Sequence, residues 1–65
     1  MVSSLYAAVR ALLRENGCCF VRQGKGSHEI WHSHITNRNV TVPVTVNKTG
    51  TANAILKQAG ITGRI

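Results

Sequence analysis

Acidic side chains are almost missing from this sequence, which has no Asp and only two Glu, Glu15 and Glu29. Eight Lys and Arg residues therefore leave a formal net charge of +6, with a sequence pI near 10.4. This imbalance favours a polyanionic partner, and charge alone allows a nucleic acid, an acidic membrane surface or an acidic protein. The basic residues stand singly and form no dense run of the kind that anchors chains to membranes. We therefore expect a basic face on a folded domain.

Cysteine is equally scarce, since Cys18 and Cys19 are the only two. Neighbouring side chains on a strand point to opposite faces, so a disulfide between them would be strained, and we predict that both pack in the core. The absence of a second pair excludes a disulfide framework and a zinc site with cysteine spacing. The sequence also lacks the long apolar run of a signal peptide or a membrane span. These absences favour a reducing cytoplasm.

The length of 65 residues leaves no room for a second core or a buried cofactor cavity. We therefore predict one domain over residues 1–65, with no cofactor and no metal ion. A fold of this size works on its surface, so its substrate is expected to be large.

A helix is predicted over residues 5–16, where apolar side chains recur at helical spacing. Ser3 or Ser4 is expected to cap its start, and Gly17 is expected to provide the left-handed residue after its end. The apolar stripe consists of Leu5, Ala8, Val9, Leu12 and Leu13.

Three strands are predicted next, over residues 18–23, 27–32 and 40–42. Residues 24–26 supply a hairpin turn and residues 33–39 form a polar loop. Pro43 is expected either to stop the third strand or to confine it to an edge of the sheet. Alternation along the second strand places one set of side chains on one face and Glu29 and Trp31 on the other. The first set is His28, Ile30 and His32.

A second helix is predicted from about Thr49 to its cap at Gly60. The expected fold is thus α+β in the order αβββα, with a three-stranded antiparallel sheet and both helices on one face.

Several short segments in this order resemble the HicA family, and the likeness spans nearly the whole chain. They are Asn16-Gly17, Arg22, Gly26-Ser27-His28, Val40-Thr41-Val42-Pro43 and Ile55-Leu56-Lys57-Gln58-Ala59-Gly60. The resemblance implies a fold similar to double-stranded-RNA-binding domains. It also implies a toxin of a toxin–antitoxin pair that cleaves messenger RNA and is inhibited by a HicB-type antitoxin. The glycine-serine-histidine step carries the single catalytic histidine of that family, which here is His28.

Physical chemistry supports His28 independently, because imidazole titrates near neutral pH and can remove a proton from a ribose 2′-hydroxyl. The alternative is a structural histidine whose hydrogen bonds are satisfied. Lys25 and the amides of Gly24 and Gly26 are candidates to hold the attacked phosphate, and Ser27 is a candidate to orient the histidine or the substrate. The alternative for this segment is a solvated hairpin.

Contacts with the RNA backbone are expected from Arg22, Lys48 and Lys57, although each of these cations can equally be a solubilising charge. His32 and His34 are interpreted as structural or solvated, and no general acid is assigned. The aromatic side chains of Phe20 and Trp31 could stack on an unpaired base, but both are assigned to packing because a large aromatic in so small a domain is more often part of the core.

Two further hypotheses belong to other functional classes. One is a non-catalytic RNA-binding module with the same fold, which would tolerate the loss of His28. The other is a structural module that uses the exposed edge of the sheet for protein contacts. Both RNA hypotheses predict a steep loss of RNA binding as salt rises, and the structural one does not.

Overall fold

The computed structural model describes residues 4–65, so the expected cap at Ser3 lies outside the described residues. The elements follow one another in the predicted order αβββα. Their bounds are Tyr6–Glu15 for α1, Cys19–Gln23 for β1, His28–Ser33 for β2, Arg38–Pro43 for β3 and Thr49–Gln58 for α2. The molecule measures 34 × 26 × 16 Å along its principal axes. No helix within residues 4–65 has the length and apolar character needed to cross a membrane.

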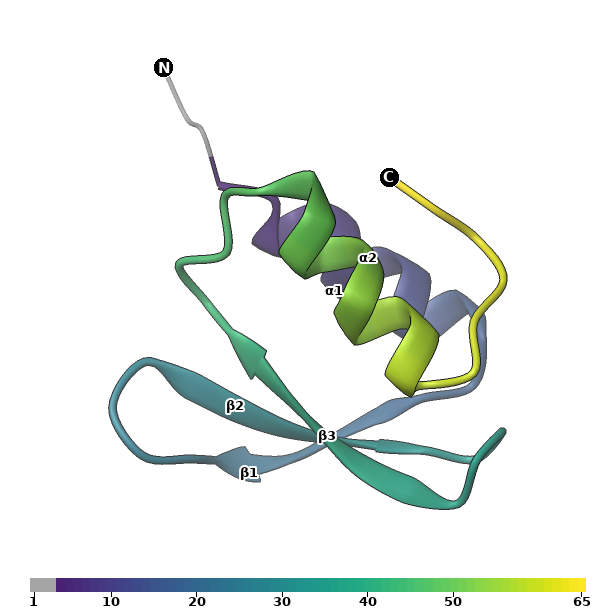
Figure 1. Ribbon diagram of the computed structural model, residues 1–65. Coiled ribbons are helices and arrows are strands. Elements are labelled where there is room, and N and C mark those ends of the chain that lie inside the picture. Colours follow the sequence, from purple (N-terminus) through teal and green to yellow (C-terminus); the bar gives the residue numbers. More distant parts are fainter. Residues whose placement is uncertain (1–3) are drawn as a thin grey trace.

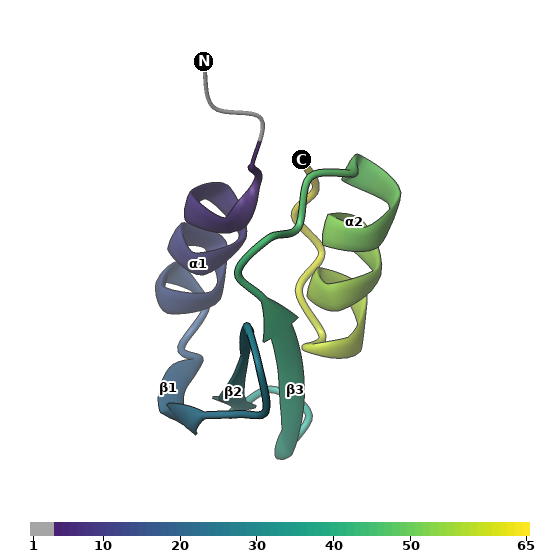
Figure 2. The same cartoon turned by 90° about the vertical axis from the view of Figure 1, so that its left-hand side faces the viewer.

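The three strands form an antiparallel sheet in the order β1-β2-β3, so β2 is central and the other two strands lie at the edges. Both helices lie over the same face of this sheet, as Figures 1 and 2 show. The predicted α+β architecture is therefore confirmed, with one face of the sheet covered and the other open.

Side chains of β2 alternate between these two faces. Trp31 is 1% exposed and Ser33 is fully buried beneath the helices, whereas His28 on the open face is exposed. Since residues two apart share a face, Ile30 and His32 lie with His28 as predicted.

The predicted bounds of the loop over residues 33–39 are wrong at both ends. Ser33 is the last residue of β2, and β3 already begins at Arg38. The reason is a buried contact, in which Ser33 Oγ donates a 2.6 Å hydrogen bond to the carbonyl of Ala59 at the end of α2. The same oxygen accepts bonds from the amides of Ile35 and Thr36 at 3.2 and 3.4 Å. One hydroxyl thus joins the strand, the turn after it and the second helix.

The core lies between the helices and the covered face of the sheet. Of the predicted stripe on α1, Val9 and Leu13 are fully buried and Leu5 and Leu12 partly so, whereas Ala8 is exposed. The buried apolar residues are Val9, Leu13, Cys18, Trp31, Val40, Val42, Val46, Ala52, Ile55, Leu56, Ala59 and Ile61.

The assignment of Cys19 and Phe20 to packing is wrong, since Cys19 is exposed and Phe20 is 47% exposed. Both residues lie on β1, an edge strand whose five side chains are all exposed. An irregularity in the pairing between Phe20 and Arg22 also shifts the register of this strand against β2. Cys18, just before the strand, is buried as predicted.

The helix ends carry the expected caps. Ser4 Oγ accepts a 3.2 Å hydrogen bond from the amide of Tyr6 at the start of α1. Gly17 and Gly60 follow the two helices with φ of +84° and +80°, a conformation that costs residues with a side chain about 1–2 kcal/mol. The predicted roles of Ser4, Gly17 and Gly60 are therefore confirmed.

A hydrogen-bonded group connects α1 to β2. Glu29 Oε1 accepts a 2.7 Å bond from the hydroxyl of Tyr6 and a 3.0 Å bond from Trp31 Nε1. Burial and, to a lesser extent, the adjacent Glu29 carboxylate raise the pKa of Tyr6 above its ordinary value of 10.0. The neutral hydroxyl is therefore favoured by the fold.

We predict that Gly60→Ala destabilises the protein more than Gly17→Ala. A Cβ at Gly60 would lie 2.7 Å from Ile35 Cγ2 and 2.9 Å from Thr36 Cγ2, whereas a Cβ at Gly17 meets nothing within 4 Å. Gly17→Ala should cost about 1–2 kcal/mol from φ alone. Gly60→Ala should cost a further ~1–3 kcal/mol from overpacking. Urea unfolding followed by the fluorescence of Trp31, the only Trp, measures both, and equal losses would contradict the prediction.

We also predict a loss of stability in alkali that depends on Tyr6. The pKa of Tyr6 is higher in the folded than in the unfolded protein, so the neutral Tyr6 hydroxyl contributes to the free energy of unfolding. This contribution is complete below pH 10 and is lost as the pH rises through the folded-state pKa. The free energy of unfolding should therefore fall less over this range in Tyr6→Phe than in the wild type. Tyr6 is the only Tyr, so tyrosinate absorbance reports it alone. Equal titration midpoints in the native and urea-unfolded protein would refute the prediction.

Candidate functional site

The candidate catalytic residue, His28, is the first residue of β2 and its side chain is exposed on the open face of the sheet. Its backbone is held on both sides, because its amide donates to the carbonyl of Lys25 at 3.2 Å and its carbonyl accepts from the amide of Gly24 at 2.8 Å. Across the sheet it pairs with Pro43. The imidazole is thus accessible while the backbone that carries it is fixed.

The turn before His28 is closed by a side chain that sequence reasoning did not single out. Gln23 Nε2 donates to the carbonyl of Gly26 at 3.2 Å and to the carbonyl of His28 at 3.1 Å. Gly26 has a φ of +63°, which the turn requires and glycine adopts without strain. The carbonyl of Ser27 accepts a 2.9 Å bond from the amide of Val44. These bonds define the turn that presents His28.

Four of the predicted site residues are consecutive in this turn and are all exposed. They are Lys25, Gly26, Ser27 and His28. Arg22 of β1 pairs with Ile30, so it shares the open face and is a diagonal neighbour of His28, with Cα atoms about 7–8 Å apart. The structure therefore brings one candidate base and two cations, Lys25 and Arg22, to the same end of the sheet.

The other two predicted cations lie on the helical side of the molecule. Lys48 immediately precedes α2 and Lys57 lies in its last turn, about 13 Å further along the helix axis. Figure 1 shows α2 over the covered face of the sheet, opposite to the open face. The contacts of Lys48 and Lys57 with the RNA backbone stay predictions.

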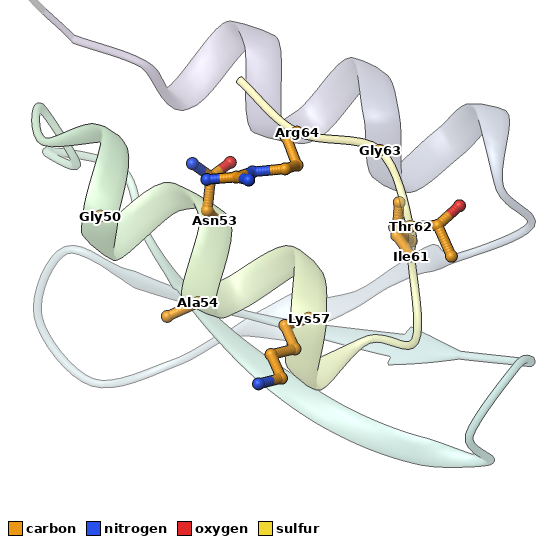
Figure 3. A pocket seen from close by; sticks show the side chains of 8 residues that line it. All are labelled: Gly50, Asn53, Ala54, Lys57, Ile61, Thr62, Gly63 and Arg64. Carbon is orange, nitrogen blue, oxygen red and sulfur yellow. The ribbon is translucent and has the colours of Figure 1, made fainter.

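Lys57 borders a shallow cavity of about 440 Å³ between α2 and the C-terminal segment. Figure 3 shows the side chain of Arg64 extending over α2 toward Asn53. Asn53 is already engaged, because its Oδ1 accepts a 2.8 Å bond from the amide of Ile65. The cavity is lined by Gly50, Asn53, Ala54, Lys57, Ile61, Thr62, Gly63 and Arg64.

The other two histidines lie at the far end of the open face. His32 is four residues along β2 from His28, which separates their Cα atoms by about 13 Å. Its Nδ1 lies 2.8 Å from Asn39 Oδ1, its ring makes an edge contact with that of His34 at a centroid distance of 4.9 Å, and His34 Nε2 lies 3.8 Å from Cys19 Sγ. This separation places His32 out of reach of a phosphate bound at His28.

The arrangement around His28 matches the chemistry of proton transfer beside a bound anion. An exposed imidazole can accept a proton, and Arg22 and Lys25 can neutralise a phosphate. Within residues 4–65, no group of three or more His, Cys, Asp or Glu side chains is placed to hold a metal ion.

Comparison with protein families gives a match to the model described as the HicA toxin of bacterial toxin-antitoxin, over residues 6–61. The matched region contains all five secondary-structure elements and the whole turn that presents His28. Comparisons with curated proteins and with solved structures gave no significant match.

The two free thiols should differ sharply in reactivity. Cys19 is exposed whereas Cys18 is buried, so we predict that one thiol reacts rapidly with a disulfide reagent in the native protein and that the second reacts only on unfolding. Cys19→Ser should abolish the rapid phase and Cys18→Ser should preserve it. Two rapid equivalents in the native wild type would show that Cys18 is not protected by the fold.

Proposed function

Because this chain belongs to the HicA toxin family of bacterial toxin–antitoxin pairs, we propose that it is an endoribonuclease that cleaves messenger RNA with His28 as its catalytic residue. We propose in addition that the reaction needs no metal ion and that a HicB-type antitoxin inhibits it. The family gives the toxin role, and the residues around His28 are what support the chemistry.

The observation that supports this proposal most is the exposed imidazole of His28 on a hydrogen-bonded turn. Hydrogen bonds to its own amide and carbonyl hold the backbone that carries the ring. Arg22 on the neighbouring strand and Lys25 in the turn are at the same end of the sheet as His28. The net charge of +6 attracts RNA from a distance. A histidine that served only to pack a strand would not be expected to face solvent at such a position.

In the proposed reaction, His28 accepts the proton of a ribose 2′-hydroxyl. The 2′-oxygen then forms a bond to the adjacent phosphorus, and the bond from phosphorus to the 5′-oxygen of the next nucleotide breaks. The products are a 2′,3′-cyclic phosphate and a 5′-hydroxyl, whose proton comes from water. Arg22, Lys25 and the amide of Gly26 stabilise the charge that develops on the phosphate.

Inhibition by the antitoxin follows from covering the same surface. A partner of opposite charge would associate rapidly with the exposed cations Arg22 and Lys25 and exclude RNA from His28. The association should weaken as salt rises, because these two charges are exposed.

We predict that His28→Ala lowers the rate of RNA cleavage by at least about 100-fold, the lower end of the contribution of a general base. The assay uses a defined RNA with a metal chelator present. The matched control is His32→Ala, on the same strand and face about 13 Å away, which should cleave like the wild type.

Cleavage by His28→Ala at the wild-type rate would refute the catalytic role. Absence of cleavage by the wild type, combined with RNA binding that falls steeply with salt in both proteins, would favour the non-catalytic RNA-binding module instead.

A further inference from the structure

A second hollow opens between α1 and the β1 side of the sheet, and the proposed reaction uses none of its side chains. It has a volume of about 270 Å³. Figure 2 shows α1 standing over this edge of the sheet. The hollow is lined by Tyr6, Arg10, Arg14, Phe20, Glu29 and Trp31.

The carboxylate in this hollow is held in one orientation. Both hydrogen bonds to Glu29, from the hydroxyl of Tyr6 and from Trp31 Nε1, are accepted by Oε1. Glu29 is only partly buried and lines the same hollow, and neither of these two hydrogen bonds uses its second oxygen, Oε2. An ionised carboxylate only accepts hydrogen bonds, so a ligand that binds here must donate them.

An aromatic surface and two cations lie around that carboxylate. Phe20 is 47% exposed, and its ring contacts that of Trp31 edge to face, with centroids 5.9 Å apart and planes at 81°. Arg14 lies with Cζ 5.9 Å from the centroid of the Trp31 ring, and Arg10 is one helical turn away on the same side of α1. Exposed aromatic rings next to cations bind unpaired nucleotides by stacking on the base and neutralising its phosphate.

From these side chains we propose that the hollow binds one unpaired guanine of the RNA substrate. This proposal rests on the proposed function, since it assigns a base preference to that reaction. Guanine is the one standard base with two adjacent donors on its Watson–Crick edge, N1–H and the N2 amino group, and both can donate to Glu29 Oε2. Adenine and cytosine place a ring-nitrogen acceptor beside their amino group, and uracil flanks its N3–H with two carbonyl oxygens. Each of these would direct a lone pair at the carboxylate.

The guanine and the cleaved bond lie on opposite sides of the sheet. Glu29 follows His28 directly, so their side chains point to opposite faces. Because β1 is an edge strand about 4.8 Å from β2, a single RNA strand can pass around this edge and reach both sites. Arg22 lies on β1, on the open-face side of that path. The preferred guanine is therefore separated from the cleaved phosphate by intervening nucleotides.

The first test changes the ligand and leaves the protein intact. RNAs that are identical except for guanosine or inosine at one position differ only in the N2 amino group there. With the position varied along the RNA, the wild type should cleave the guanosine RNA about tenfold better at one offset from the cut, the effect of one hydrogen bond to a charged group. Equal cleavage at every offset would overturn the proposal while leaving the ribonuclease function intact.

The second test changes the carboxylate. Glu29→Gln keeps an oxygen acceptor for Tyr6 and Trp31 and places an NH₂ donor where Oε2 stood, so it should lose the preference for guanosine but still cleave other RNAs. Glu15→Gln removes the only other acidic side chain, which is exposed at the end of α1, and should keep the preference. Retention of the preference by a folded Glu29→Gln protein would overturn the proposal. Urea unfolding establishes whether that variant is folded, and the inosine test decides if it is not.

A third measurement separates this proposal from the ribonuclease function. Guanosine and inosine 5′-monophosphates are titrated into His28→Ala protein, with Trp31 fluorescence as the readout, because Trp31 borders the hollow. About tenfold tighter binding of the guanosine nucleotide, lost in Phe20→Ala, supports the site even if the wild type cuts no RNA. If Phe20→Ala instead weakens only the antitoxin complex, with no nucleotide preference in either protein, the hollow is a protein contact and the proposal is wrong.

Discussion

Which side chains of β2 face solvent on the open face depends on the contacts that its inward-facing side chains make beneath the helices. Three consecutive inward positions are fixed by contacts of different kinds: Glu29 by the hydroxyl of Tyr6 on α1, Trp31 by the core, and Ser33 by the carbonyl of Ala59 at the end of α2. A shift of one residue in register would move all three into solvent and bring outward-facing side chains beneath the helices. The inward contacts therefore also determine which side chains face solvent.

The helices and the strand order were predictable because their signals are local. Helical spacing on α1, glycines after both helices and the alternation along β2 all depend on a few neighbouring residues, and each is observed. The wrong predictions concern residues whose environment depends on parts of the chain that are distant in sequence. Phe20 and Cys19 have strand-forming and apolar character, but their exposure follows from β1 being an edge strand. Ser33 reads as a loop residue because its partner, Ala59, is 26 positions away.

The candidate site also has features that the sequence indicates and features that only the folded structure shows. His28, its turn and Arg22 could be predicted because a short motif and strand pairing bring them together. The role of Gln23 could not, because nothing in the sequence indicates that its amide bonds two carbonyls of the following turn. Glu29 is one of only two acidic residues in a basic chain, and its donor Tyr6 comes to it only because α1 lies beside β2.

The alternation of packed and exposed side chains along β2 also affects which substitutions such a protein can accept during evolution. Its inward side chains carry the packing, whereas His28 is exposed and adds little to it. Substitutions at His28 should therefore leave a folded chain, so selection on that position acts through activity and not through folding. A copy that lost its activity could persist as an intact fold, and lineages could alter outward positions of this strand without first acquiring compensating changes in the core.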